Sequence, residues 1–322
     1  MSESAGAGVA AAALAADYQA LRHGLGAVWV ERDVVRATGR EAVAYLQGQL
    51  SQDVAALAVG GSAPSLLLSP QGKVDAWLRV SRVAEDGFLL DTDAGWGEAV
   101  VARLGRFRLR SKVELSLVAG WRCLALRGPG VPGPGASEPA AVAPALAVLA
   151  FWPGVAGVDL LGESVQVPTG ARLCGHDAFT ALRVEAGVPA MGSELSERTI
   201  PAEAGLVEGS VSFTKGCYTG QELVARLDSR GNRVPRRLRG VMVEWGLLEG
   251  VEPSPAAGAE LLNGEKVVGA LTTVASSPGL ESVVALAYVR REVDPPAELT
   301  LRWSGGTLPA QVRELPLIAV EA

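Results

Sequence analysis

The chain has 322 residues, 48% of them hydrophobic and 20% charged, a composition that is typical of globular proteins and excludes general disorder. This length exceeds what one ordinary hydrophobic core serves, so two or three domains are expected. A formal net charge of −6 and a pI of about 5.2 exclude a protein whose whole surface binds nucleic acid, and leave room only for a local basic patch.

Cysteine and histidine usage predicts neither a disulfide framework nor a metal site. Cys123, Cys174 and Cys217 are odd in number, far apart and free of any C-x-x-C pair, which favours a reducing compartment. His176 follows Cys174 by two residues, but no further ligand stands nearby, so a structural role is expected. Residues 1–16 lack a basic signal-peptide start and are expected to form a frayed tail before a helix, and no apolar run spans a bilayer, so a cytoplasmic protein without a membrane partner is predicted.

The first third of the chain is predicted to be an antiparallel meander with two helices. Residues 38–41 (TGRE) have the form of a capping box, in which Thr38 accepts from first-turn amides and Glu41 reaches back, and apolar residues follow at helical spacing. Turn signals at 70–72 and 85–87 separate β segments. The expected strands are 27–38, 65–69, 74–83, 88–91 and 112–117, and the second helix is 96–107.

The remainder is predicted to contain a loop, a helix and a β-rich end. Asp177 is expected to cap a helix over 178–186, with Gly187 following it. From residue 238 onward, valine-rich strands alternate with Gly/Pro turns, which indicates a small β-barrel or sandwich. The expected regions are an α+β region at 1–126, a Gly/Pro/Ala-rich loop at 127–150, a second α+β region at 151–237 and the barrel at 238–322.

The most informative stretch is residues 215–222 (KGCYTGQE). Gly216 and Gly220 permit positive φ and the close approach of a ligand or a neighbouring strand. Between them lies Cys217, two residues after Lys215, and a nearby cation raises the thiolate fraction of a cysteine. The alternative for Cys217 is a small, buried and inert side chain, because most free cysteines are of that kind.

Gln221, Glu222 and Arg226 follow at spacings that suit the start of a helix, where an acidic first turn is favourable. An arginine-rich segment then leads to residue 239. Guanidinium groups suit carboxylates and RNA phosphates equally, and the alternative is a solvated linker into the barrel. Its members are Arg226, Arg230, Arg233, Arg236, Arg237 and Arg239.

Residues 215–222 resemble the signature of the YgfZ family. These are folate-binding proteins linked to iron–sulphur cluster maturation and, in bacteria, to tRNA modification, and they are relatives of the glycine-cleavage T protein, an aminomethyltransferase. Similar segments follow the family's order at 39–53, 69–74, 183–189, 201–206, 269–272 and 286–291. The resemblance implies a three-domain, disc-like α+β fold with mixed and antiparallel sheets, a C-terminal β-barrel and a central funnel for tetrahydrofolate or a one-carbon derivative.

The resemblance also implies roles for individual residues. Cys217 would be the essential thiol, with Lys215 favouring its thiolate, and Glu185 would hold the pterin, since a carboxylate can accept two hydrogen bonds from an aminopyrimidine edge. Asp75 lies where the aminomethyltransferases usually carry two aspartates, but its neighbour here is Ala76. The other implied folate-site residues are Gln221, Glu222 and Arg226.

Each of these assignments has a structural alternative. Glu185 could be a solvated glutamate at a helix end, and Asp75 a surface residue at the start of a strand.

Three functions follow from these observations. The first is a folate-dependent accessory protein that acts on iron–sulphur clients or assembly proteins through Cys217. The second is a tetrahydrofolate-dependent aminomethyltransferase of one-carbon metabolism. The third is a folate sensor or tRNA-modification factor without chemistry of its own, with tRNA held by the arginine-rich segment.

Overall fold

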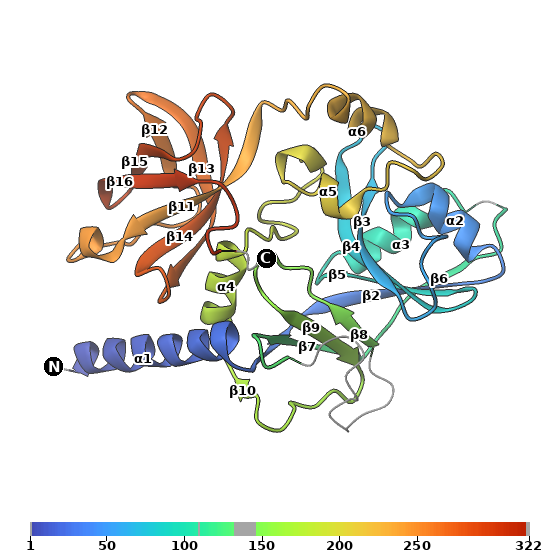
Figure 1. Cartoon of the computed structure of the whole chain (residues 1–322), viewed down its shortest axis with the longest axis horizontal. Coiled ribbons are helices and arrows are strands. Elements are labelled where there is room, and N and C mark those ends of the chain that lie inside the picture. The colour runs from blue at the N-terminus through green and yellow to red at the C-terminus, as the bar shows by residue number, and fades with distance from the viewer. Residues whose placement is uncertain (1, 109, 132–145, 320–322) are drawn as a thin grey trace. The chain divides into compact units, whose positions relative to one another are not determined.

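The computed structural model describes residues 2–108, 110–131 and 146–319, which form two compact units that alternate along the chain. Unit 1 consists of Met1–Val30, Cys123–Pro189 and Leu238–Ala322, and unit 2 consists of Glu31–Arg122 and Ala190–Arg237. Figure 1 shows the elements of both, from the N-terminal helix in blue to the barrel strands in orange and red. The four regions expected from the sequence were consecutive stretches, whereas each compact unit combines two or three separated segments of the chain.

Unit 2 is built on the predicted antiparallel meander. Its sheet has the strand order β3-β4-β5-β2-β6, in which β4 is the longest strand. The strands are β2 (Arg32–Thr38), β3 (Ser62–Leu68), β4 (Val74–Ala84), β5 (Gly87–Asp93) and β6 (Glu114–Leu117). The helical elements are α2 (Ala42–Gln49), α3 (Gly97–Gly105), η1 (Pro201–Glu203), α5 (Val207–Ser210) and α6 (Gln221–Asp228).

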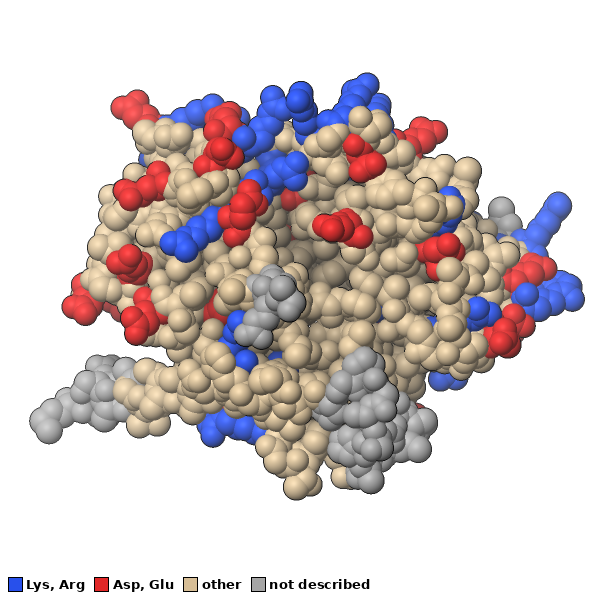
Figure 2. Space-filling model, viewed as in Figure 1, with Lys and Arg blue, Asp and Glu red and all other residues tan. Residues whose placement is uncertain are grey.

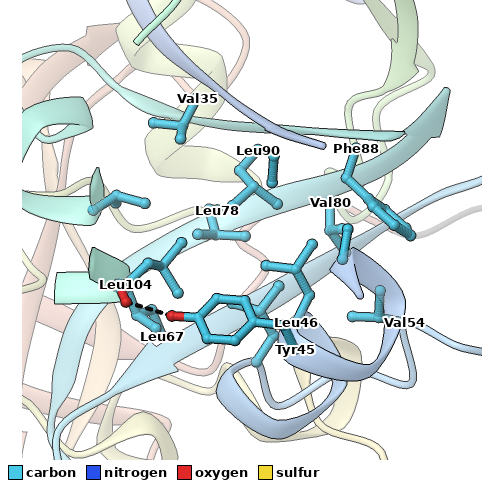
Figure 3. Packing of buried hydrophobic residues seen from close by; sticks show 14 of the residues in the cluster. Val35, Tyr45, Leu46, Val54, Leu67, Leu78, Val80, Phe88, Leu90 and Leu104 are labelled. Carbon is cyan, nitrogen blue, oxygen red and sulfur yellow. Dashed lines mark hydrogen bonds between the residues drawn. The ribbon is translucent and has the colours of Figure 1, made fainter. Parts of the chain in front are cut away.

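The sheet of unit 2 carries a hydrophobic core on each face, because successive side chains of a strand point to opposite sides. Leu67 of β3 packs with Tyr45 and Leu46 of α2 and Leu104 of α3 in the first core. In Figure 3 the Tyr45 hydroxyl donates to the carbonyl of Leu104, which ties the two helices together. The second core lies on the other face, and its β3 residues are Leu66 and Leu68.

Unit 1 contains a long N-terminal helix, a second sheet and a closed barrel. The five-stranded sheet has the order β10-β1-β7-β9-β8, and the six-stranded barrel has the order β11-β14-β13-β12-β15-β16. The barrel is the β-rich end predicted from residue 238. The helical elements are α1 (Ser2–His23), α4 (His176–Glu185) and η2 (Trp245–Leu248). The sheet strands are β1 (Gly26–Val30), β7 (Arg122–Arg127), β8 (Leu146–Leu149), β9 (Gly157–Gly162) and β10 (Arg172–Leu173), and the barrel strands are β11 (Arg236–Glu244), β12 (Glu260–Asn263), β13 (Lys266–Ser277), β14 (Ser282–Arg290), β15 (Ala297–Trp303) and β16 (Gly306–Arg313).

Part of the loop predicted at 127–150 is a strand. Leu146–Leu149 forms β8, which pairs antiparallel with β9. Its apolar side chains and this pairing outweigh the Gly/Pro/Ala composition of the preceding segment. Residues 132–145 of the predicted loop lie outside the described residues.

The predicted capping box before α2 is wrong. Glu41 itself occupies the N-cap position, without a side-chain cap. Its Oε2 instead accepts the backbone N–H of Lys112 at 2.9 Å, in the segment that leads into β6. A tertiary contact thus uses the carboxylate that the local sequence assigned to the helix.

The predicted cap of α4 is also wrong by two residues. Gly175 is the N-cap and Asp177 lies in the first turn. The carboxylate that accepts the Gly175 N–H, at 2.8 Å, belongs to Asp17 of α1. The other end is as predicted, since Gly187 follows the helix with φ of 73°.

No helix in the described part of the chain is long and apolar enough to cross a bilayer.

Candidate functional site

Three of the sequence motifs meet in unit 2 around the segment that carries Cys217. The ammonium of Lys215 donates to the carbonyls of Gln47 and Leu50, each at 2.6 Å, and to that of Gln52 at 2.9 Å. These carbonyls lie at and just beyond the C-terminal end of α2, where the helix dipole favours a cation. The Thr219 N–H adds a fourth bond, to the carbonyl of Gly48 at 3.2 Å.

The contacts of Lys215 give it a positioning role. Three acceptors match the three N–H groups of an ammonium, so its charge is directed at main-chain oxygens. Burial lowers the pKa of Lys215 to about 8, while the nearby carboxylate of Asp53 opposes this shift. The expectation that Lys215 promotes the thiolate of Cys217 has no contact in support of it, and the lysine instead fixes the loop to α2.

Cys217 lies between two anchored neighbours. Lys215 is held by α2, and Tyr218 packs against the second core of unit 2, where burial raises the pKa of its phenol to about 12. The thiol of Cys217 itself is exposed, whereas Cys123 and Cys174 are buried. A buried Cys217 is therefore wrong, and the chain presents this residue to solvent on a loop whose neighbours are anchored.

Gly220, three residues after Cys217, allows the hairpin at 69–73 to touch the segment at 215–222. Gly220 has φ of 83°, and a Cβ there would lie 2.5 Å from the carbonyl oxygen of Ser69. Gly72, in the turn after Ser69, is equally confined, because its Cβ would lie 2.6 Å from Cβ of Leu223. The hairpin at 69–73 thus packs directly on the start of α6. Gly216 differs, since its Cβ would meet nothing within 4 Å.

Helix α6 begins at Gln221, as the spacing predicted, with Gly220 at its N-cap. The Gln221 Oε1 accepts the N–H of Tyr218 at 3.1 Å, which closes the loop onto the helix. Glu222 is exposed in the first turn and Arg226 is exposed near the last. Both side chains are available to a ligand, while Gln221 shapes the loop.

Asp75, two residues into the strand after the hairpin turn, is engaged in an ion pair. Its Oδ2 accepts from Nε of Arg103 of α3 at 2.8 Å, and its side chain is 25% exposed. Nη2 of Arg103 also donates to the carbonyl of Leu68 at 2.7 Å. The alternative of a plain surface residue is therefore wrong, and no pattern along the chain pointed to the arginine 28 positions away.

Glu185 belongs to unit 1, whereas the other candidate residues belong to unit 2. It is 0% exposed, so the solvated alternative is wrong. The hydroxyl of Tyr18 in α1 donates to its Oε2 at 2.8 Å, and Oε1 has no hydrogen bond of ordinary geometry to a described residue, although the Ser277 hydroxyl is close enough to oppose the pKa shift. Burial is the main cause that raises the pKa of this carboxyl, and it also raises that of Tyr18.

The end of the arginine-rich segment is largely committed to contacts within the chain. Arg236 pairs with Glu203 at 3.2 Å, and Nη2 of Arg237 donates to the carbonyl of Asn232 at 2.6 Å. Arg239 pairs with Glu314 at 2.8 Å. This favours the linker interpretation for these three residues.

His176 begins α4, and the thiol of Cys174 donates to the carbonyl of Arg172 at 3.2 Å. Among the residues that the structure describes, no group of three or more His, Cys, Asp or Glu side chains is placed to hold a metal ion.

Comparison with known proteins relates this architecture to two groups. Residues 236–318, which contain the barrel strands, match the glycine cleavage T-protein C-terminal barrel domain. The chain is 28% identical to an aminomethyltransferase of Thermus thermophilus over 311 residues, which is 88% of this chain and 84% of that protein. It is 30% identical to the tRNA-modifying protein YgfZ of Photorhabdus laumondii over 218 residues, which is 62% of this chain and 65% of that protein.

The chain is thus similar in sequence to both the YgfZ proteins and the aminomethyltransferases. A solved aminomethyltransferase of the glycine cleavage system from Bartonella henselae has the same fold, with a TM-score of 0.77 over 95% of this chain and 89% of that chain, at 23% identity. The α+β fold with a C-terminal barrel, expected from the resemblance, is thereby confirmed. The T-protein-like fold alone does not separate the two groups, because function resides in the site.

Proposed function

We propose that this chain is a folate-binding accessory protein of iron–sulphur cluster assembly or repair, with Cys217 as its essential thiol. The observation that supports this most is the exposed thiol on a loop fixed at both sides, by the Lys215 ammonium and by the Tyr218 ring. Fixing a loop while leaving one reactive group exposed suits a thiol that must meet a client. The iron–sulphur role itself follows from the resemblance of residues 215–222 to the YgfZ signature, whereas the similar protein of Photorhabdus laumondii is named for tRNA modification.

The chemistry of the thiol has three candidate forms. The thiolate can ligate an iron atom of a client's cluster for a short time, since soft thiolates suit such sites. It can attack a one-carbon unit carried by folate, forming a C–S bond as the C–N bond to the folate breaks, or attack a disulfide of a client, forming a mixed disulfide and releasing the other sulphur as a thiolate. A single thiolate supplies one ligand, so a cluster held here would take its remaining ligands from the client, which favours transfer over storage.

Glu185 fits a folate in one respect. A fully buried carboxylate with one oxygen that lacks a regular hydrogen bond is a suitable acceptor for the N–H groups of a pterin. The other oxygen is occupied by Tyr18, so a pterin would share this carboxylate with the phenol or replace it. When bound, tetrahydrofolate would supply a one-carbon carrier.

The experiment that tests the proposal is complementation of a deletion strain at matched protein levels. Wild type and Cys174→Ala, which alters a buried cysteine, should restore a cluster-dependent enzyme, and Cys217→Ala should not, although it folds normally. Full restoration by folded Cys217→Ala would refute an essential thiol.

The second candidate is a tetrahydrofolate-dependent aminomethyltransferase, which the similarity over 311 residues to the Thermus thermophilus protein favours. It predicts that purified protein forms methylenetetrahydrofolate from an aminomethyl-lipoyl carrier and tetrahydrofolate, and that Asp75→Asn abolishes this turnover. An absence of turnover at saturating carrier would exclude it.

A further inference from the structure

A basic hollow lies in unit 2, away from the arginine-rich segment. Its volume is about 920 Å³, and its lining includes Arg40, Arg108, Arg110 and Lys112 against one acidic residue, Glu114. Four cationic side chains here contrast with a chain whose net charge is −6. In Figure 2 lysine and arginine side chains project at the right-hand edge, over the region where Figure 1 places β6, with acidic side chains among them.

The hollow is held by contacts between two backbone segments. A Cβ on Gly39, whose φ is 132°, would lie 2.2 Å from the carbonyl oxygen of Lys112, so only glycine permits this approach. The N–H of Lys112 donates to Glu41 as described, and Nη1 of Arg108 donates to the carbonyl of Val113 at 3.2 Å. These bonds use the backbone of Lys112 and leave its side chain exposed.

We propose that this hollow binds the phosphodiester backbone of RNA. Guanidinium forks match phosphate oxygens, and several of them around one open hollow suit a polyanion more than a single small anion. Phe107, next to the lining residue Arg108, is 47% exposed, and the guanidinium of Arg103 stacks on its ring at 4.5 Å. An exposed aromatic ring beside a basic surface can stack an unpaired base, as in many single-strand RNA sites.

The hollow and the loop of Cys217 lie at opposite ends of the short helix α2. Gly39 and Arg40 precede the N-terminal end of α2, whereas Lys215 fixes the Cys217 loop to the C-terminal end of the same helix. An eight-residue helix is about 12 Å long. RNA held in the hollow would thus have its neighbouring nucleotides within reach of the thiol loop. The proposal goes beyond the proposed function, because RNA binding requires neither folate nor Cys217.

The test is fluorescence anisotropy of the full-length protein with a labelled tRNA transcript at 50 to 200 mM salt. If all four cations contact phosphates, the logarithm of the affinity should fall with the logarithm of salt with a slope of about −2.8 to −3.6, which is a loss of about 50- to 150-fold over this range. Arg110→Glu/Lys112→Glu should bind at least about tenfold more weakly at 50 mM salt and should lower the slope by about 1.4 to 1.8.

The matched control is Arg230→Glu/Arg233→Glu, which changes the charge equally at two exposed arginines of unit 2 outside the lining of the hollow. It should retain affinity within about threefold and keep the wild-type slope, since neither arginine would contact phosphate. Equal losses in both variants, a larger loss in the control, or no binding by wild type at 50 mM salt would each overturn the proposal. Far-UV circular dichroism and urea unfolding confirm that both variants are folded.

Discussion

Replacing Lys215 by methionine tests whether the loop of Cys217 depends on one partly buried ammonium. Methionine keeps much of the aliphatic chain but leaves the carbonyls of Gln47, Leu50 and Gln52 without their donor. Each hydrogen bond to a charged group is worth about 1.5 kcal/mol or more, and relief from burying the charge offsets part of the loss. We expect a net loss of about 2 kcal/mol in the free energy of unfolding at pH 7.

The pH dependence of this loss follows from the lowered pKa of Lys215. The folded protein releases the proton near pH 8, whereas the unfolded chain keeps it to about 10.5, so wild-type stability rises between these values. Between pH 7 and pH 9.5 the linkage relation gives about 2 kcal/mol, or about 1 to 2 kcal/mol after a discount for partial exposure of the side chain. Lys215→Met cannot titrate, so the stability gap between wild type and variant should widen by that amount.

Urea unfolding of both proteins at the two pH values measures this gap, with Lys112→Met as the control because that side chain is exposed. The control should stay within about 0.5 kcal/mol of wild type at both values. A gap that is the same at pH 7 and pH 9.5, or that narrows, would refute a buried ammonium with a lowered pKa.

Three further predictions concern single residues. Gly220→Ala should cost about 2 to 4 kcal/mol of unfolding free energy, because its positive φ and the nearby carbonyl of Ser69 leave no room for Cβ. Gly216→Ala should stay within about 0.5 kcal/mol of wild type, and equal shifts in melting temperature for the two variants would contradict this packing. A thiol reagent should modify one cysteine per native chain, at Cys217, with the other two reacting only in denaturant; peptide mapping that finds another site first would be inconsistent with the burial described. Because burial raises the pKa of Glu185, the folded protein keeps the carboxyl proton to a higher pH than the unfolded chain does, so the free energy of unfolding falls as pH rises between the unfolded and folded pKa values. The free energy of unfolding of Glu185→Gln should lack this fall with pH, and a variant with the wild-type pH profile would count against the prediction.

The sequence predicted local elements well and failed where distant groups compete for the same atoms. The strands of unit 2, the start of α6 and the barrel follow from periodicity and turn residues, which act over a few positions. Glu41 and Asp177 are good local caps, but a loop amide takes the first carboxylate, and Asp17 takes the place of the second. Neither contact is visible from spacing along the chain.

The same limit applies to the candidate site. The motif singled out Cys217 but left its exposure open, and the expected partner of Lys215 was the neighbouring cysteine, whereas its actual acceptors lie 163 to 168 positions away. Tyr18, which donates to Glu185 from 167 positions away, carried no signal of its own. Such pairings are decided by how the two halves of a unit fold together, which pattern and propensity do not encode.

Helix α2 links the two candidate surfaces of unit 2 physically. Its C-terminal carbonyls and the peptide bonds just beyond them need donors, and Lys215 supplies three N–H groups from a segment that lies more than 160 residues further along the chain. Because those bonds fix the lysine, the exposed Cys217 two residues on is held at the same end of the helix. The basic hollow lies at the other end, so a change in α2 would disturb anion binding and thiol presentation together, whereas changes confined to Arg110 or Cys217 should separate them.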